Sequence, residues 1–303
     1  MRAGRIANAK YFRFMIQIEN NRLRVAITPL GAELKTVFHK THNLEYIWQG
    51  DPAFWAKSSP ALFPIVGELK EKTYRYKDKS YNLSRHGFAR EKGFTVSCQE
   101  GSTVTFTLES SAETTTVYPF DFAFSITYRL EEETLQVGYS VSNRGDKDLL
   151  FSVGGHPAFK LPLAEGTAYT DYRLEFEKAE TAGRWPISKE GLIEKAPQPF
   201  LENSKVLPLS KELFAKDAVV LKHLQSDHVS LLSDKTEHGL QFSFKGFPYL
   251  GLWAAPGADF LCIEPWCGIA DSVDADGNLE NKEGINRLAA GERFDVAWSV
   301  RFF

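Results

Sequence analysis

Residues 122–141 read FAFSITYRLEEETLQVGYSV and contain the pattern that decides the fold. Apolar side chains occupy every second position from Phe122 to Leu130, and they do so again from Leu135 to Val141. Only the polar residues 131–134 separate these two runs. Alternation at a period of two, interrupted by a short polar turn, is typical of an antiparallel hairpin that buries one face.

The same alternation recurs along the whole chain. Further runs lie at 23–27, 104–108, 172–176, 240–244 and 294–302. Helical signals are few: Asp51 followed by Pro52 predicts a short helix over 51–55, and residues 210–214 predict a single turn. Residues 180–209 are rich in Pro, Lys and Glu and are interpreted as a long surface excursion. Because no strand–helix–strand rhythm occurs, we expect an all-β fold, a large antiparallel β-sandwich.

The composition of the 303 residues is that of a folded globular protein, with 43% hydrophobic and 25% charged residues. The net charge is −3, from 36 basic and 39 acidic residues, and no long block of one sign occurs. This balance argues against a nucleic-acid partner, because duplex binders carry a basic stripe. Aromatic residues reach 13%, which suits both pleated sheets and the apolar faces of sugars.

No metal, cofactor or membrane segment is predicted. The three cysteines, Cys98, Cys262 and Cys267, are interpreted as reduced thiols without a zinc-ligand pattern around them. The acidic residues 271–278 fail the calcium-loop template and are interpreted as a solvated turn. No run approaches the roughly 20 apolar residues of a membrane helix, and no apolar secretory segment follows residues 1–10. We therefore expect a cytoplasmic protein.

Four segments break the alternation and collect Gly, Pro, His and acidic residues: 58–67, 85–90, 153–159 and 262–268. Such interruptions are where functional sites tend to lie. His156 follows two glycines and precedes a proline, and His86 precedes a glycine. Glu264 ends the apolar run 260–263 beside Trp266, where burial would raise its proton affinity. Each has a structural alternative, a satisfied histidine or a glutamate that accepts backbone hydrogen bonds.

His86, His156 and Glu264 together supply the groups that hemiacetal chemistry requires. Opening an aldose ring needs a base for the anomeric hydroxyl proton and an acid for the ring oxygen. Rotation about C1–C2 followed by reclosure then exchanges the α and β anomers. Neither a metal nor a nucleotide takes part, in keeping with the absence of phosphate-loop, zinc and nucleophile-elbow motifs from this sequence.

An ordered set of short motifs resembles the aldose 1-epimerases, the galactose-mutarotase-like proteins. The motifs are GAEL at 31–34, FPIVG at 63–67, HGF at 86–88, GHP at 155–157, EPW at 264–266 and LAAGE at 288–292. The resemblance extends from about Met15 to the C-terminus and is greatest for the branch associated with bacterial lactose and tagatose operons. It implies a single β-supersandwich domain over 15–303, with residues 1–14 as an N-terminal extension.

The resemblance also implies roles for individual residues. Glu264 would be the general base on the anomeric hydroxyl and His156 the general acid at the ring oxygen. His86 would bind or polarise the sugar, and Asp217 falls where the family carries an aspartate that binds sugar hydroxyls. The aromatic residues near the motifs are expected to line a sugar-binding groove; they are Phe63, Phe88, Trp253 and Trp266.

One departure from the family concerns the substrate. Better-known mutarotases carry a sugar-contacting Arg in an Asn-Arg pair soon after the position of Gly67, where this chain reads ELKEK at 68–72. Lys70 or Arg90 would have to replace that contact, with a different geometry for Lys. The stretch from His86 to Arg90 is also similar to hexose-6-phosphate mutarotases, and Arg85 would add a cation for a phosphate.

The sequence therefore predicts an isomerase, an aldose 1-epimerase acting on an aldose or an aldose phosphate. The alternative is a non-catalytic carbohydrate-binding or sugar-sensing protein on the same scaffold, because a fold does not fix a function. Glycoside hydrolysis normally requires two carboxylates, and one good candidate is found. The expected partner is a small sugar or sugar phosphate, without nucleic acid or membrane, and the protein is expected to be a monomer or homodimer.

Overall fold

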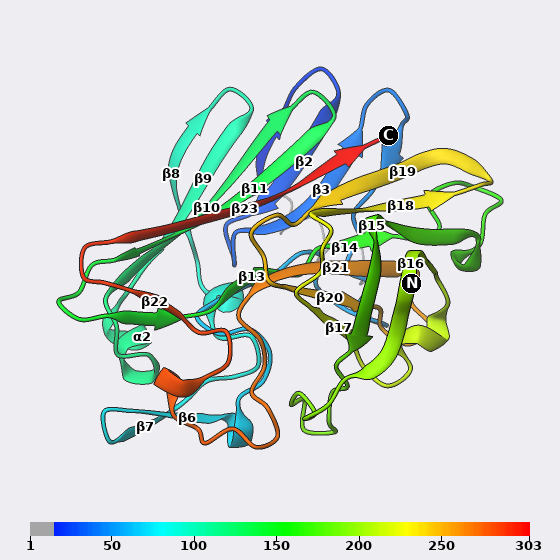
Figure 1. Ribbon diagram of the computed structural model, residues 1–303. Coiled ribbons are helices and arrows are strands. Elements are labelled where there is room, and N and C mark those ends of the chain that lie inside the picture. Colours follow the sequence, from blue (N-terminus) through cyan, green and yellow to red (C-terminus); the bar gives the residue numbers. More distant parts are fainter. Residues whose placement is uncertain (1–14) are drawn as a thin grey trace.

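The computed structural model describes residues 15–303, so the predicted extension 1–14 lies outside the described residues (Figure 1). The described chain consists mainly of antiparallel strands, and the predicted all-β fold is confirmed. Nine strands form the largest sheet. In spatial order they are β16 (Gln198–Pro208), β15 (Tyr172–Arg184), β18 (His228–Ser233), β19 (Thr236–Ser243), β23 (Arg293–Phe302), β11 (Thr134–Asn143), β10 (Phe122–Glu131), β9 (Thr103–Glu109) and β8 (Thr95–Glu100).

The hairpin predicted from residues 122–141 lies at the centre of this sheet. Strands β10 and β11 pair without a register shift from Phe122 opposite Asn143 to Glu131 opposite Thr134. The apolar side chains of both strands are buried, while Arg129 and Gln136 point to the other face. The period-two pattern therefore reports the burial of one sheet face, as expected.

Two smaller sheets complete the sandwich. A six-stranded sheet contains β17 (Val219–Lys222), β20 (Tyr249–Trp253), β21 (Phe260–Cys267), β13 (Val153–Gly155) and β5 (Ala61–Leu62), with β14 (Ala158–Lys160) also paired to β21. A four-stranded sheet contains β1 (Ile16–Glu19), β2 (Leu23–Thr28), β3 (Glu33–His39) and β4 (Leu44–Glu45). The two-stranded pairs are β12 (Leu149–Phe151) with β22 (Asn286–Leu288), and β6 (Thr73–Tyr76) with β7 (Lys79–Asn82).

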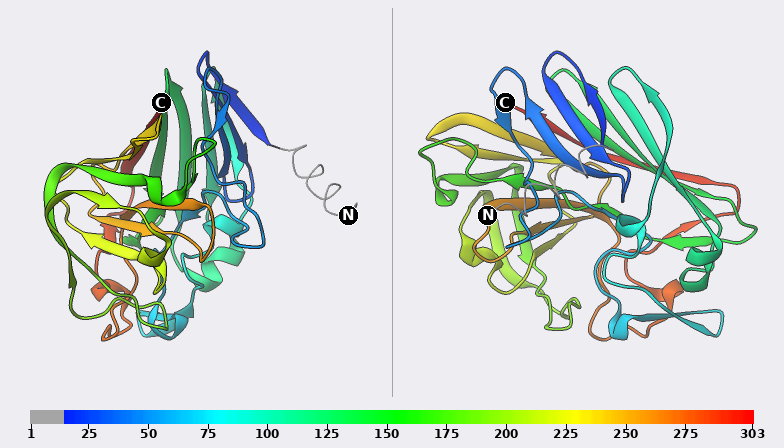
Figure 2. Two further views of the ribbon diagram at one scale, coloured as in Figure 1. Left: turned by 90° about the vertical axis from the view of Figure 1, so that its right-hand side faces the viewer. Right: turned by 180° about the vertical axis from the view of Figure 1, so that it is seen from behind.

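The sheets pack through large aromatic side chains. Phe63, which follows β5, stacks on Phe124 of the nine-stranded sheet with ring centroids 4.5 Å apart. The hydroxyl of Tyr128 donates a 2.6 Å hydrogen bond to the carbonyl of Ala32 beside the four-stranded sheet. Figure 2 shows the N-terminal strands and the nine-stranded sheet as separate layers. The nine-stranded sheet thus forms one layer, against which both smaller sheets pack.

Helices are short and lie between strands. They are α2 (Ala112–Val117) and the 3-10 turns η2 (Lys70–Lys72), η3 (Ala89–Glu91), η4 (Tyr169–Asp171), η5 (Lys211–Phe214) and η6 (Leu279–Asn281). The turn predicted at 210–214 is confirmed as η5. The helix predicted over 51–55 is wrong: the segment forms one turn, closed by a hydrogen bond from the Trp55 amide to the Asp51 carbonyl. Helix α2 was not predicted; Ser111 caps it.

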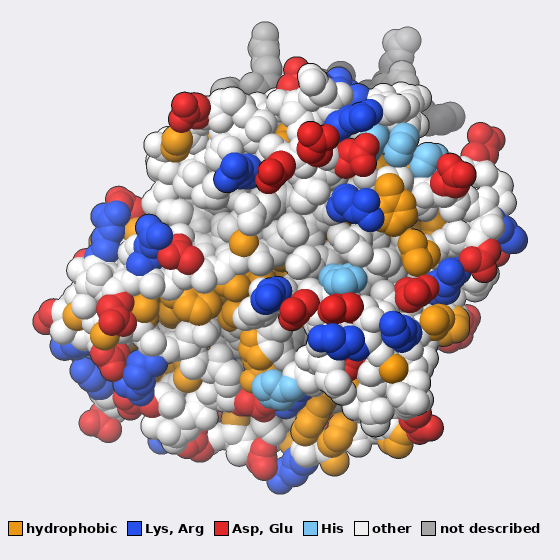
Figure 3. Space-filling view, turned by 45° about the horizontal axis from the view of Figure 1, so that its top comes forward, with side chains coloured by type: hydrophobic (Ala, Val, Ile, Leu, Met, Phe, Trp, Pro, Cys, Tyr) orange, Lys and Arg blue, Asp and Glu red, His pale blue; other side chains and the backbone are white. Residues whose placement is uncertain are grey.

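The segment 180–209, which was interpreted as a long surface excursion, is largely strand in the structure. Strand β15 extends to Arg184, and β16 begins at Gln198. Acidic and basic side chains are interspersed on the face shown in Figure 3. Among the residues that the structure describes, no helix combines the length and the apolar character needed to cross a lipid bilayer.

The structure corrects the expectation that Phe63 and Phe88 line a sugar groove. Both rings are buried in the core between the sheets, where Phe63 packs against Phe122, Phe124 and Phe151. Neither ring lines the cavity described below. Both phenylalanines lie close to the motifs in sequence, but their side chains point into the core and away from the cavity.

We predict that Phe63→Ala destabilises the fold by about 3–5 kcal/mol, because the fully buried ring leaves a cavity between the sheets. Denaturant unfolding measures the change. Phe54→Ala is the matched control, since that ring is 47% exposed and its loss is expected to cost far less. Similar losses for the two variants would contradict the assignment of Phe63 to the core.

Candidate functional site

The candidate site begins at an interruption in the pairing of β21. On one edge, β21 pairs with β20 from Cys262 to Trp266. On the other edge it pairs first with β14 and then with β13, and the chain leaves the sheet between them. The flanking pairs are Gly154 opposite Trp266 and Ala158 opposite Cys262. Continuing this register through the gap brings His156 opposite Glu264.

His156 and Glu264 are in direct contact at this interruption. The Nε2 atom of His156 lies 3.3 Å from Oε2 of Glu264, and both side chains are nearly fully buried. Glu264 was expected at the end of a strand, but β21 continues through Pro265 to Cys267. A proline is tolerated at this point because neither β13 nor β14 pairs with it.

Burial strongly disfavours the charged form of each partner. It lowers the pKa of His156 to about 3 and raises the pKa of Glu264 well above its usual range. The Nδ1 atom of His156 and Oε2 of Glu264 are buried without a hydrogen-bond partner among residues 15–303. Unsatisfied buried polar atoms are costly, so a ligand that meets them would be bound favourably.

His86 is held by reciprocal contacts with Gly67. Its amide donates to the Gly67 carbonyl at 2.8 Å, and its Nδ1 atom accepts from the Gly67 amide at 3.1 Å. Burial lowers the pKa of His86 well below its usual value, so the neutral ring carries its proton on Nε2. Gly67 has a φ of +73°, and a Cβ atom there would lie 2.4 Å from Cβ of Ala270. Only glycine fits this position.

A cavity of about 590 Å³ opens above the His156–Glu264 pair. Of the six site residues predicted from the sequence, five line it: His86, Arg90, His156, Asp217 and Glu264. The rings of His86 and His156 are perpendicular, with centroids 5.8 Å apart. Five of the six predicted site residues therefore share one cavity, although they span residues 86–264 of the chain.

Lys70 is the sixth predicted residue, and the structure does not bring it to the cavity. Its ammonium donates to the carbonyl of Ala275 at 3.1 Å, and its amide donates to Asp271 at 2.9 Å. Lys70 is held in these positions because η2 packs against the loop that follows β21. The segment 67–90 contributes two basic residues to the cavity wall, and these are Arg85 and Arg90.

The two arginines and Asp217 form one wall. A guanidinium nitrogen of Arg85 lies 3.6 Å from Oδ2 of Asp217, and Arg90 donates to the carbonyl of Arg85 at 2.8 Å. The side chain of Arg85 is 41% exposed, and that of Asp217 is 33% exposed. Both groups are therefore accessible from the cavity and oriented by their neighbours, as groups that bind hydroxyls or an anion need to be.

Three indole rings from different segments also line the cavity: Trp55, Trp253 and Trp266. Trp253 and Trp266 were predicted there, but Trp55 was not. A further unpredicted part is the loop between β15 and β16, which places Ser188 and Lys189 at the cavity mouth. Neither Trp55 nor this loop was predicted to reach the cavity, because residues 51–55 were interpreted as a helix and residues 180–209 as a surface excursion.

One group of described residues has the spacing of a metal site. Ligand atoms of His156, Cys262 and Glu264 lie within 4.8 Å of one another. Cys262 and Glu264 share a face of β21 because they are two residues apart. Burial raises the pKa of the Cys262 thiol well above its usual value, which opposes the thiolate that a metal requires. That the site works without a metal stays a prediction.

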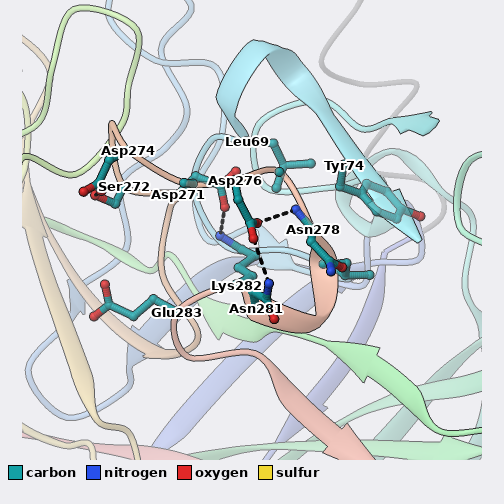
Figure 4. Close-up of a pocket in the computed structure, with 13 residues that line it drawn as sticks. Leu69, Tyr74, Asp271, Ser272, Asp274, Asp276, Asn278, Asn281, Lys282 and Glu283 are labelled. Carbon is teal, nitrogen blue, oxygen red and sulfur yellow. Dashed lines mark hydrogen bonds and ion pairs between the residues drawn. The ribbon is translucent and has the colours of Figure 1, made fainter. Parts of the chain in front are cut away.

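A second pocket, of about 370 Å³, lies outside this site and is formed by the loop after β21 (Figure 4). The interpretation of 271–278 as a solvated turn is incorrect for Asp271, which is buried and pairs with the buried Lys282 at 2.7 Å. Lys282 also donates to the Ile269 carbonyl at 2.7 Å. Its ammonium therefore neutralises the one buried carboxylate of the acidic loop.

Comparison with known proteins agrees with this geometry. The family model described as aldose 1-epimerase matches residues 15–287. Protein LacX (chromosomal) of Lactococcus lactis subsp. lactis is 35% identical over 282 residues, which cover 90% of this chain and 94% of that protein. A galactose mutarotase related enzyme from Lactobacillus acidophilus has a solved structure with a TM-score of 0.91 and 37% identity, covering 95% of this chain and 97% of that one.

A second solved structure, of a galactose mutarotase-like protein from Lactobacillus casei ATCC 334, has a TM-score of 0.89 and 33% identity over 95% of this chain and all of that one. The fold, the motifs and the matched family model agree over nearly the whole described chain. The chain belongs to the aldose 1-epimerase family.

Proposed function

We propose that this protein is an aldose 1-epimerase that interconverts the α and β anomers of an aldose by acid–base ring opening and reclosure. The observation that carries the proposal is the buried contact of 3.3 Å between His156 and Glu264 on the floor of a sugar-sized cavity. A matched acid and base at this distance serve proton transfer at two neighbouring oxygens, whereas binding alone needs neither.

In the proposed mechanism the pair carries one proton, and the reactive form is the one in which Glu264 is ionised and His156 is protonated. Glu264 removes the proton of the anomeric hydroxyl, the bond between C1 and the ring oxygen breaks, and His156 protonates that oxygen. The product is the open-chain aldehyde with a hydroxyl at C5. After rotation about C1–C2, the same transfers run in reverse on the other carbonyl face, so no proton is gained or lost overall.

The remaining polar groups would position the sugar. Neutral His86 carries its proton on Nε2, so it donates a hydrogen bond and does not compete as a base. Asp217 and Arg85 would bind sugar hydroxyls as an acceptor and a donor. The indoles of Trp253 and Trp266 would supply the apolar surface that a pyranose ring prefers.

We further propose that the preferred aldose carries a phosphate. Four cationic residues line the cavity, namely Arg85, Arg90, Lys189 and Lys216. The carboxylates among the lining residues are Asp217 and Glu264, and burial favours the neutral form of Glu264. The resulting excess of positive charge favours an anionic substrate.

Glu264→Gln and His156→Asn are each expected to reduce mutarotation ~10²–10⁴-fold, because each removes one proton-transfer partner. Exchange between anomers is measured by NMR with EDTA present, since the proposed mechanism requires no metal. Glu292→Gln, at an exposed position, serves as the control and should retain full activity.

The same assay separates the enzyme from a non-catalytic sugar-binding protein. A binding protein would bind an aldose or aldose phosphate in calorimetry without accelerating anomer exchange in the wild type. Wild-type acceleration that persists in both variants would instead reject the assigned roles while keeping the activity.

For substrate choice, the double variant Lys189→Met/Lys216→Met is expected to lower kcat/KM for 6-phosphorylated hexoses by about tenfold and for free hexoses by much less. Both lysines are exposed at the cavity mouth, so their loss leaves the fold intact. The double variant Lys235→Met/Lys245→Met removes the same two charges at exposed positions that do not line the cavity, so it controls for the change in net charge. Equal losses for both sugar classes would contradict the phosphate proposal.

The stability of the protein should depend on pH through Glu264. Because burial raises its pKa in the folded state, protonated Glu264 contributes stability that is fully present below the unfolded pKa, about 4.5, and is lost as pH rises toward the folded pKa. Glu264→Gln loses no such contribution. The unfolding free energy of the variant relative to wild type should therefore increase between pH 4.5 and pH 8, as measured in urea; a constant or decreasing difference would contradict it. Glu292→Gln should show no comparable trend.

A further inference from the structure

The ring of His156 lies against an aromatic surface that the proposed acid–base roles do not explain. The Trp55 indole stacks on the imidazole with ring centroids 4.8 Å apart and planes 28° from parallel. Trp253 also contacts His156, at 5.6 Å, but its ring is nearly perpendicular, at 82°. Trp55 thus offers its π face to His156, and that part of the face is closed to a sugar.

The position of Trp55 is fixed by its backbone and by its neighbours. Its amide donates to the Asp51 carbonyl at 2.9 Å, and its carbonyl accepts from the Trp48 indole at 2.9 Å. The ring also packs against Phe260 of β21, with centroids 5.6 Å apart. The amide, the carbonyl and the ring of Trp55 are therefore all held by neighbours. An indole fixed in this way constrains the plane in which the imidazole of His156 can lie.

Most of the other surroundings of His156 oppose its protonated form. Burial and the charges of Arg90 and Arg85 disfavour the imidazolium, as would protonation of His86 at 5.8 Å, whereas a hydrogen bond to the backbone of His156 itself favours it. Glu264 favours the imidazolium only when ionised, and the buried Cys262 thiol carries no charge. An indole face stabilises a cation above it whatever the state of the carboxyl group.

We propose that Trp55 is a positioning residue that holds His156 toward Glu264 and stabilises the imidazolium from which the ring oxygen receives its proton. The proposal rests on the proposed acid role of His156. It assigns Trp55 to the catalytic step, whereas Trp253 and Trp266 face the sugar. Loss of the indole should therefore lower kcat and leave KM nearly unchanged.

The test compares Trp55→Leu and Trp55→Phe with Trp253→Leu. In Trp55→Leu, the alkaline limb of the kcat/KM profile should move to lower pH by about 0.5–1 unit, because the protonated pair loses a stabilising contact. Trp55→Phe should fall between Leu and wild type, since benzene has the weaker π face. Trp253→Leu removes an indole from the same cavity and should raise KM with a smaller shift of the limb.

A second measurement needs neither sugar nor turnover. The imidazole ¹⁵N chemical shifts of His156 report how much of the shared proton it holds, and this share should decrease in the order Trp, Phe, Leu at position 55. An unchanged or larger share in both Trp55 variants, or an equal effect of Trp253→Leu, would overturn the proposal. Absence of anomer exchange by the wild type would instead overturn the proposed function, and the ¹⁵N shifts would still decide the role of Trp55.

Discussion

The cross-strand register around β21 is the constraint on which the site depends. Strands β13 and β14 pair with the same edge of β21 in one continuous register, and the residues between them leave the sheet. That interruption places His156 opposite Glu264 and leaves Glu264 without a strand partner on this edge, while its other edge stays paired with β20. A shift of one residue would turn one of the two side chains to the other face. The contact between His156 and Glu264 is therefore a property of sheet geometry, and the loops add only the surrounding walls.

Burying His156 and Glu264 costs electrostatic free energy whenever either group is charged. Both side chains are buried, and burial favours the neutral imidazole and the neutral carboxyl group. Formation of the ion pair transfers a proton over the 3.3 Å contact without moving any heavy group far. The indoles of Trp55 and Trp253 pack against the imidazole of His156, and apolar neighbours of this kind screen charge weakly. A site of this kind is preorganised before its substrate arrives.

The sequence predicts the sheet much better than the walls of the cavity. Alternation predicted β10, β11 and β23 because burial of one face imposes a local period of two. Interruptions of that period pointed to His86, His156 and Glu264. Nothing local specifies which loops cover a cavity, so the loop between β15 and β16 was missed. Lys70 and Phe63 were assigned by proximity in sequence, yet packing against Asp271 and the core directs both away.

The position of Trp55 is another feature of the cavity that could not be predicted from the sequence. The Asp-Pro start of its segment was interpreted as a helix, whereas the structure keeps a single turn whose geometry directs the indole over His156. The carbonyl of Trp55 is bound by the indole of Trp48, a contact that local propensity does not encode. Side chains that reach a cavity from an irregular segment are found only when the tertiary contacts are known.

The buried Lys282 supplies the acidic loop 271–278 with a counterion from the chain itself. Acidic loops of similar composition are commonly organised by a divalent ion, whose occupancy follows the ion supply. Here an ammonium that belongs to the chain pairs with Asp271 and binds the carbonyl of Ile269. The adjacent Ala270 packs on Gly67, which in turn holds His86. This side of the cavity is thus assembled with a counterion that is part of the chain and cannot dissociate.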